Sequence, residues 1–300
     1  MSFPPVRDCR FLTGPTGSGK TGAGVELAHK IDAEIISMDS MALYRGMDIG
    51  TAKPTAVERG AVPHHLVDVI GPDEEYSVAE YIAAAHEKVT EICRRGRSVL
   101  FVGGTPLYLK GLLRGLFKGP PADPAFRRSV EEEARRHDAG WLHARLVQVD
   151  PASATRLHPN DTRRIVRALE VHDKTGTPIS DWQQQFGTVP EQTGNLVYVL
   201  DWPRHELNER IDRRVDEMFA AGLVEEVRGL MALGRPLSKT ARQAVGYREV
   251  IEHLEGVRHL DDTIALVKQH TRQLAKRQGT WFRSLPESRY VAMGGLLAFD

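Results

Sequence analysis

The chain has 300 residues, of which 41% are hydrophobic and 27% are charged, so it suits a globular protein with a substantial core. Its 40 basic and 40 acidic residues give a formal net charge of zero, and any affinity for nucleic acid must therefore come from local basic patches. Only Cys9 and Cys93 are present, the N-terminus lacks a signal-like apolar run, and no stretch is long and apolar enough to span a membrane, so we expect a cytoplasmic protein without a disulfide framework or a cysteine-rich zinc site.

The first part of the chain alternates between predicted strands and helices. The strands are expected at Arg10–Thr13, Ala33–Met38 and Ser98–Val102. Helices are expected after Gly14–Thr21 as far as Lys30, from Ser77 to about Arg95, and after Gly103-Gly104-Thr105. Ser77 and Glu80 have the spacing of a capping box, and residues 43–75, rich in glycine and proline, are expected to form one long ordered loop. This order is typical of a parallel α/β sheet.

The pattern changes at Pro120, after which only helical periodicity continues to about Gly187. Pro124, Pro151 and Pro159 are expected near helix starts. A strand is predicted at Asn195–Leu200, followed by helices at Arg204–Ala221, Val224–Leu233, Ala241–Leu254 and Leu260–Phe282. We therefore divide the chain into an α/β core of residues 1–119 and 188–300 and a helical insertion domain of residues 120–187.

The strongest motif lies between the first predicted strand and helix. Gly14-Pro15-Thr16-Gly17-Ser18-Gly19-Lys20-Thr21 matches G-x-x-x-x-G-K-[ST] in full. In such a loop the backbone N–H groups surround phosphate oxygens, the lysine supplies a positive charge and the threonine can reach Mg²⁺. The fold class is accordingly a P-loop NTPase-like parallel sheet with a helical insertion and C-terminal helices.

The motif indicates polyphosphate binding and does not by itself indicate ATP hydrolysis. The strand Ser98–Val102 ends in Gly103-Gly104-Thr105 and offers no carboxylate, whereas Asp39 follows the strand Ala33–Met38. Because ligands bind at the carboxyl ends of parallel strands, Asp39 and Thr105 are both expected at the phosphate-binding edge. Asp39 is compatible with three roles at this point: a metal ligand, a general base or a turn residue.

A basic stretch follows near the C-terminus. Residues 268–283 carry Lys268, Arg272, Lys276, Arg277 and Arg283 and no acidic residue, and Arg272, Lys276 and Arg283 recur on one helix face. Such a helix is either a solvated surface or a nucleic-acid contact, and the neighbouring Trp281 and Phe282 favour the contact. The histidines show no spacing typical of a metal site, and we interpret them as structural or surface residues.

Several long blocks resemble the tRNA dimethylallyltransferase family. They are GPTGSGKT, ISMDSMALYRGMDIGTAKP, PHHLVDV, VGGTPLYLKGLL, RLHPNDTRRIVRALEV, VGYREV and TRQLAKRQGTWFR, and they run in order from about Leu12 to Arg283. The resemblance implies transfer of a dimethylallyl group from dimethylallyl diphosphate to N6 of adenine-37 in tRNA. It also implies Mg²⁺ as cofactor and the tRNA anticodon stem-loop as partner, and we expect a monomer. Related adenylate isopentenyltransferases share the P-loop and the aspartate but lack the long helical parts.

The resemblance assigns roles to residues of this chain. Asp39 would be the base at N6, with Lys20 and Thr21 also catalytic and Thr21 on Mg²⁺. The diphosphate would lie on Gly14–Thr21 and one of Arg210 and Arg214. The tRNA would contact Asp39, Ser40, Met41, Ala42, Thr105, Arg127, Arg163, Arg164, Ile165, Val166, Arg167, Arg242, Gln243, Gly246, Tyr247, Arg248, Arg272, Lys276 and Arg277.

Three other functions remain compatible with the residues themselves. A P-loop with a strand-end aspartate also fits a small-molecule kinase. Prenylation of free adenylate and RNA binding without catalysis are the other two. They differ in their products: a phosphorylated small molecule, modified AMP, or no product at all.

Overall fold

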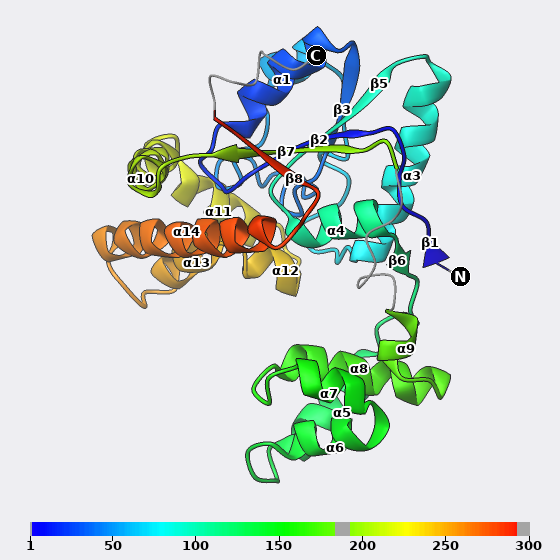
Figure 1. The fold of residues 1–300 in the computed structure, drawn as a ribbon. Helices are drawn as coiled ribbons and strands as arrows, with labels where there is room; N and C mark the ends of the chain where they lie inside the picture. The colour runs from blue at the N-terminus through cyan, green and yellow to red at the C-terminus, as the bar shows by residue number, and fades with distance from the viewer. Residues whose placement is uncertain (1, 184–192, 293–300) are drawn as a thin grey trace. The chain divides into compact units, whose positions relative to one another are not determined.

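The computed structural model describes residues 2–183 and 193–292. The chain forms two compact units, a core unit of Val6–Leu113 and Gln192–Asp300 and a helical unit of Met1–Pro5 and Arg114–Glu191 (Figure 1). Among the described residues, no helix combines the length and apolar character that crossing a membrane would need.

The core unit is built on a six-stranded sheet with the order β4-β3-β5-β2-β7-β8, in which all paired neighbours are parallel (Figure 1). The strands are β2 (Arg10–Thr13), β3 (Ala33–Ser37), β4 (His64–His65), β5 (Ser98–Val102), β7 (Leu196–Asp201) and β8 (Ser288–Ala292). Because the strands are parallel, the segments that follow β2, β3, β5 and β7 all leave the sheet at the same edge.

Nine helices belong to the described part of the core unit. They are α1 (Lys20–Lys30), α2 (Ala56–Ala61), α3 (Val78–Arg94), α4 (Pro106–Arg114), α10 (Arg204–Ala220), α11 (Leu223–Met231), α12 (Lys239–Arg242), α13 (Tyr247–Leu254) and α14 (Leu260–Arg283). Helix α1 packs on β2, β3 and β5, and a buried cluster that includes Leu12, Leu27, Ile35 and Leu100 fills the interface. This apolar layer fixes the sheet edge from which the site residues project.

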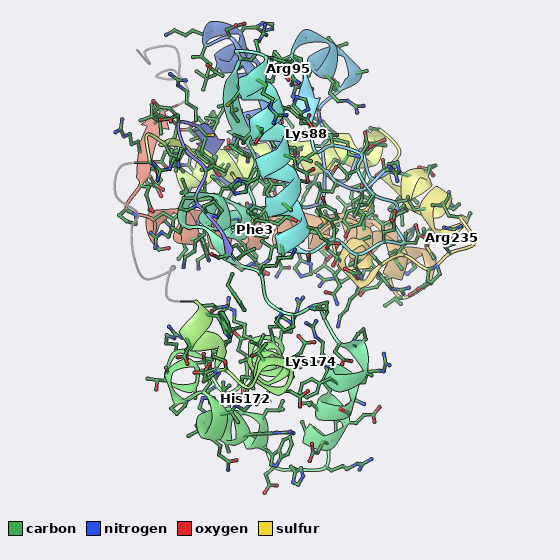
Figure 2. All side chains as sticks on the ribbon, turned by 90° about the vertical axis from the view of Figure 1, so that its right-hand side faces the viewer. Phe3, Lys88, Arg95, His172, Lys174 and Arg235 are labelled. Carbon is green, nitrogen blue, oxygen red and sulfur yellow. The ribbon has the colours of Figure 1, made fainter. Side chains whose placement is uncertain are left out.

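Helix α3 packs against β3 and β5 and carries charged side chains on its outer surface, among them Lys88 (Figure 2). Lys88 pairs with Glu91 within the helix, at 2.8 Å. Arg95, just after the helix, pairs with the buried Glu34 of β3 at 2.7 Å. Ser77 and Glu80 form the predicted capping box at the start of α3.

The helical unit contains α5 (Pro124–Ala134), α6 (Trp141–Val149), α7 (Pro151–Arg156), α8 (Thr162–Thr175) and α9 (Ile179–Trp182), together with β1 (Ser2–Phe3) paired antiparallel to β6 (Leu116–Phe117). Its apolar core includes Val130, Leu146 and Leu169. Residues 114–119 and residues 2–5 group with this unit instead of the core, because β1 pairs with β6 and Phe117 of β6 packs against the apolar core of this unit.

Two local predictions are wrong, and three strands were not predicted. Residues 43–75 are not one loop, because a Thr55–Glu58 capping box starts α2 and His64–His65 joins the sheet as β4. The single helix over Ala241–Leu254 is two helices, since residues 243–246 are not helical between α12 and α13. Pro159 lies near a helix start as predicted, three residues before Thr162, the first residue of α8, whose N-cap is Asp161. Strand β8 was not predicted, and neither were the short strands β1 and β6.

Candidate active site

The P-loop, Gly14–Thr21, joins β2 to α1 as predicted. Gly17 and Gly19 have φ of 82° and 86°, a conformation that favours glycine. Since Gly19 at the N-cap has no side chain to cap α1, the first-turn N–H groups are left for an anion. Lys20 Nζ donates to the carbonyl of Pro15 at 2.8 Å, so the amine is held over the loop.

The side chain of Lys20 lies in an environment that disfavours its charge. Burial lowers the pKa of Lys20 to about 8; the carboxylate of Asp39 opposes this shift, and the guanidinium of Arg214 adds to it. The desolvated amine of Lys20 and the nearby guanidinium of Arg214 therefore make this part of the loop an environment that suits an anion.

The end of β7 and helix α10 support the P-loop from the side. Trp202 Nε1 donates to the carbonyl of Ser18 at 3.0 Å, and Arg210 Nε donates to the carbonyl of Gly17 at 3.0 Å. The Arg210 guanidinium also stacks on the Trp202 ring, 4.3 Å from its centroid. The guanidinium of Arg210 thus binds the backbone of the P-loop.

Asp39 lies two residues beyond the end of β3, at the sheet edge where the P-loop also lies. Its Oδ1 accepts from the N–H of Met41 at 2.9 Å, which is the turn role considered above. The other carboxylate oxygen is not needed for that turn. Thr105 Oγ1 accepts from the N–H of Ser40 at 3.0 Å, and the Thr105 N–H donates to the carbonyl of Met38 at 3.2 Å, so the predicted partners Asp39 and Thr105 are neighbours.

The close approach of these two loops explains the sequence Gly103-Gly104-Thr105. A Cβ on Gly103 would lie 2.1 Å from the carbonyl oxygen of Met38, which leaves no room for any other residue. The glycine therefore lets the segment after β5 pass against the segment after β3 and brings Thr105 beside Asp39.

A pocket of about 400 Å³ joins the P-loop to Asp39. It brings together many predicted site residues that are far apart in the sequence: Thr16, Asp39, Ser40, Met41, Thr105, Arg214, Gln243, Gly246, Tyr247 and Arg277. Ala42, by contrast, is buried at 4% exposure, which corrects its prediction as a tRNA contact.

Arg210 and Arg214 differ in position although both lie on α10. Arg214 lines the pocket, and its Nη2 contacts the carbonyl of Thr51 at 3.5 Å. Burial lowers the pKa of Arg214, and the Asp39 carboxylate opposes this shift. Arg214 is therefore the arginine whose charge faces the cavity, whereas Arg210 braces the P-loop.

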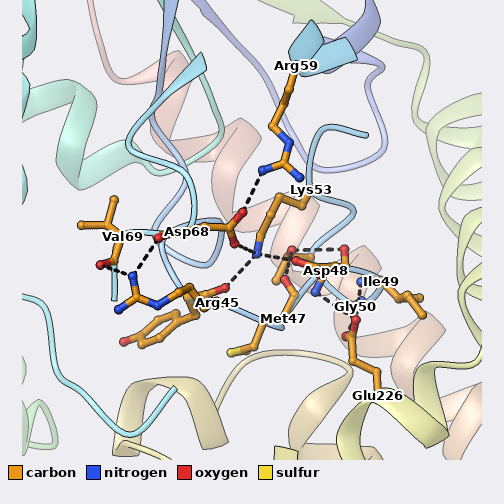
Figure 3. Close-up of polar contacts among 12 residues, drawn as sticks. Arg45, Met47, Asp48, Ile49, Gly50, Lys53, Arg59, Asp68, Val69 and Glu226 are labelled. Carbon is orange, nitrogen blue, oxygen red and sulfur yellow. Dashed lines mark hydrogen bonds and ion pairs between the residues drawn. The ribbon is translucent and has the colours of Figure 1, made fainter. Parts of the chain in front are cut away.

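A polar network fixes the loop that supplies Gly50 and Thr51 to the pocket (Figure 3). Its centre is Lys53, whose Nζ donates to Asp48 at 2.5 Å, to Asp68 at 2.6 Å and to the carbonyl of Tyr44 at 2.8 Å. The buried ammonium is thus fully surrounded by acceptors, which makes the loop rigid without regular structure.

Glu226 of α11 holds the same loop from the other side (Figure 3). Its carboxylate accepts from the N–H groups of Asp48, Ile49 and Gly50 at 3.0, 2.8 and 3.3 Å. Tyr247 Oη donates to Glu226 at 2.6 Å, so the tyrosine ring is held at the pocket wall.

Helix α14 separates two pockets. Arg277 faces the pocket with Asp39, whereas Arg272, Lys276 and Arg283, the predicted common face, line a second pocket of about 440 Å³ beside β7 and β8. Arg272 also pairs with Asp212. Lys268 pairs with Asp216 of α10 at 2.7 Å. The basic stretch is therefore partly neutralised, which the local sequence does not reveal.

The residues of the helical unit that were predicted to contact tRNA differ in their exposure and in their ion pairs. Ile165 and Val166 are buried in its core, at 0% and 3% exposure, which corrects their prediction as tRNA contacts. Arg127 and Arg167 both pair with the buried Glu170, Arg127 through Nε and Nη2 at 2.8 and 2.7 Å. Arg163 and Arg164 are the exposed cations of this run.

The remaining predicted residues surround α12 and α13. Arg242 pairs with Glu255 at 2.7 Å, and Arg248 bonds to the buried Glu249 and to His270. Among the other histidines, His65 pairs with Glu34, consistent with the structural interpretation. Thr51 and Gln278 also line the pocket; sequence reasoning did not select Thr51 and gave Gln278 no role of its own within the stretch Arg272–Trp281.

The chain is similar to known proteins over almost its whole length. A family model described as IPP transferase matches residues 42–285. The tRNA dimethylallyltransferase of Rhodopirellula baltica is 51% identical over 294 residues, covering 95% of this chain and 88% of that protein. The tRNA dimethylallyltransferase of Symbiobacterium thermophilum is 50% identical over 284 residues, covering 94% and 87%.

Solved structures of similar proteins point to the same family. The tRNA isopentenylpyrophosphate transferase from Bacillus halodurans has 38% identity and a TM-score of 0.70, covering 96% of this chain and 90% of that one. A eukaryotic dimethylallyltransferase acting on tRNA has 29% identity and a TM-score of 0.79, covering 95% and 74%. The predicted P-loop NTPase-like fold class is confirmed, and the chain belongs to the IPP transferase family.

Proposed function

We propose that this protein transfers the dimethylallyl group of dimethylallyl diphosphate to N6 of adenine-37, the tRNA base beside the anticodon, giving N6-isopentenyladenosine and diphosphate. One observation carries the proposal: a single pocket is lined by Thr16 of the P-loop, by the Asp39 carboxylate and by Arg214. A residue of the phosphate-binding motif and a carboxylate that could accept a proton therefore line one cavity, and the relatives named above act on tRNA.

The residues suggest how the reaction proceeds. N6 of adenine attacks the allylic carbon, the bond from that carbon to the diphosphate oxygen breaks, and the N6 proton passes to Asp39. The free carboxylate oxygen of Asp39 would take the proton while Oδ1 keeps its bond to the Met41 N–H. The P-loop N–H groups, Lys20 and Arg214 would stabilise the charge on the departing diphosphate.

Mg²⁺ is part of this proposal. The ion keeps several waters and takes few protein ligands when it binds phosphates. The Thr21 hydroxyl lies at the second residue of α1, next to Lys20, and together with diphosphate oxygens it suits that donor set. When bound, the ion would neutralise charge on the diphosphate.

The tRNA side of the proposal involves both units. A base in an anticodon loop must leave its stack to reach a pocket, at a cost of a few kcal/mol. Arg277 at the pocket and the exposed Arg163 and Arg164 of the helical unit are the cations that we assign to the anticodon stem-loop. We further propose that the protein acts in the cytoplasm as a monomer.

The acceptor atom can be tested with two anticodon stem-loops, one with adenine at position 37 and one with purine, which lacks the exocyclic amine. With labelled dimethylallyl diphosphate, we expect label on the adenine stem-loop only. Equal labelling of both would rule out N6 as the acceptor. If neither stem-loop is labelled while full-length tRNA is, the essential contacts lie outside the stem-loop.

Donor binding should depend on pH through Lys20. Without a bound donor, the pKa of Lys20 is about 8. A bound diphosphate favours the protonated amine and therefore raises this pKa. The affinity for the diphosphate should be highest below this pKa of the donor-free protein. Above it, the affinity should fall by up to about tenfold per pH unit. Titration calorimetry of diphosphate in two buffers should show proton uptake at alkaline pH, and Lys20→Arg should abolish the dependence.

The two faces of α14 should differ in their effect on tRNA binding. Arg277→Ala should lower the salt slope of binding by about 0.7 to 0.9, the value of one lost phosphate contact. Arg272→Ala is the matched comparison, because Arg272 is already paired with Asp212, and its effect on the slope should be smaller. Filter binding across a salt series measures both slopes. Equal slopes for Arg277→Ala and the natural protein would exclude Arg277 as a phosphate contact.

A further inference from the structure

Gln278 of α14 bridges two loops of the active site. Its Oε1 accepts from the N–H of Thr16 in the P-loop at 2.9 Å. Its Nε2 donates to the carbonyl of Gly104, in the segment after β5, at 2.7 Å. One amide side chain thus spans the phosphate-binding loop and the loop that neighbours the predicted base.

The connection continues to Asp39. Gly104 is followed by Thr105, whose Oγ1 accepts from the N–H of Ser40 at 3.0 Å. Ser40 directly follows Asp39, which is held by the Met41 N–H. A path of hydrogen bonds and covalent links therefore runs from the P-loop through Gln278 to the carboxylate on the other side of the pocket.

The chemistry of the residue suits this bridge. A glutamine amide donates at one end and accepts at the other, which a carboxylate or a thioether cannot do. The space is also restricted: a Cβ on Gly104 would lie 2.9 Å from Gln278 Nε2 and 3.5 Å from Lys20 Nζ. The amide of Gln278 and the amine of Lys20 therefore both lie close to the backbone of Gly104, in the segment that carries Thr105.

We propose that Gln278 is a positioning residue for prenyl transfer, and this rests on the proposed function. It sets the separation between the donor diphosphate on the P-loop and the adenine N6 at Asp39. Transfer needs the allylic carbon and N6 in a near-attack geometry, and a displacement of about 1 Å can slow such a step about 10²-fold. Substrate binding needs no such alignment and should be little affected.

The test uses Gln278→Met, which fills the space without either hydrogen bond, and Gln278→Asn, which keeps the amide but is too short for both. Gln273→Met, an exposed glutamine of the same helix, is the control. We expect single-turnover transfer at saturating substrates to slow about 10- to 10²-fold in both Gln278 variants, with Kd for diphosphate and for tRNA changed less than about threefold. The control should match the natural protein.

A double-mutant cycle with Thr105→Val tests whether the path is shared. If both residues act on one alignment, the double variant should lose little more than the worse single variant. Additive losses of the transfer rate in the double variant would overturn the inference. So would a Gln278→Met variant that transfers at the normal rate and is only less stable to heat. Because the natural protein is assayed in parallel, failure of prenyl transfer there would instead overturn the proposed function.

Discussion

Asp39→Asn should slow turnover about 10²-fold or more, while the affinity for tRNA stays within about twofold. Asparagine retains the shape and the oxygen that accepts from the Met41 N–H, so the turn after β3 should persist. It cannot accept the N6 proton. The two quantities are kcat at saturating donor and tRNA, and Kd from filter binding.

Asp201→Asn is the matched control for that variant. Asp201 is also a strand-end aspartate, at the end of β7, but it lines the second pocket and not the one with Thr105 and Arg214. Its turnover should equal that of the natural protein. If Asp39→Asn also turned over at a near-normal rate, Asp39 would be a turn residue only.

Lys20→Ala should reduce transfer by about 10²- to 10³-fold, since it removes a positive charge at the leaving diphosphate. The charge acts on the bound donor and more strongly as the diphosphate departs, so both donor affinity and kcat should fall. Lys30→Ala, at the other end of α1, should leave both unchanged. Donor affinity is measured by calorimetry and transfer by single-turnover kinetics.

Two results would contradict this view of the P-loop. Lys20→Ala could retain the full transfer rate, which would mean that the diphosphate does not depend on the lysine. The natural protein could hydrolyse ATP rapidly without tRNA, which would favour a phosphoryl-transfer enzyme. A strand-end carboxylate is absent from the end of β5, and we expect neither result.

The parts of the site that the sequence predicts well depend on short-range signals. The P-loop is contiguous, and Asp39 lies two residues after a strand of five buried residues. The topology of parallel strands then brings Thr105 to the same edge without any further information. Local capping boxes likewise predict the start of α3.

The parts that escaped prediction depend on partners distant in the sequence. Gln278 is separated from Thr16 by 262 residues and from Gly104 by 174, so no local pattern identifies its role. The basic stretch of α14 looks unopposed in the sequence, but Asp212 and Asp216 of α10 pair with two of its cations. Strand β8 has an exposed pattern and is recognised only through its pairing with β7.

The most direct test is to incubate the natural protein with tRNA and dimethylallyl diphosphate carrying a labelled allylic carbon, then digest the tRNA and separate its nucleosides. Parallel reactions contain free AMP in place of tRNA, or ATP in place of the donor. We expect the label in N6-isopentenyladenosine from adenine-37, with no modified AMP and no phosphorylated product. Label on AMP, label at another tRNA position, or phosphoryl transfer without prenylation would contradict the proposed function.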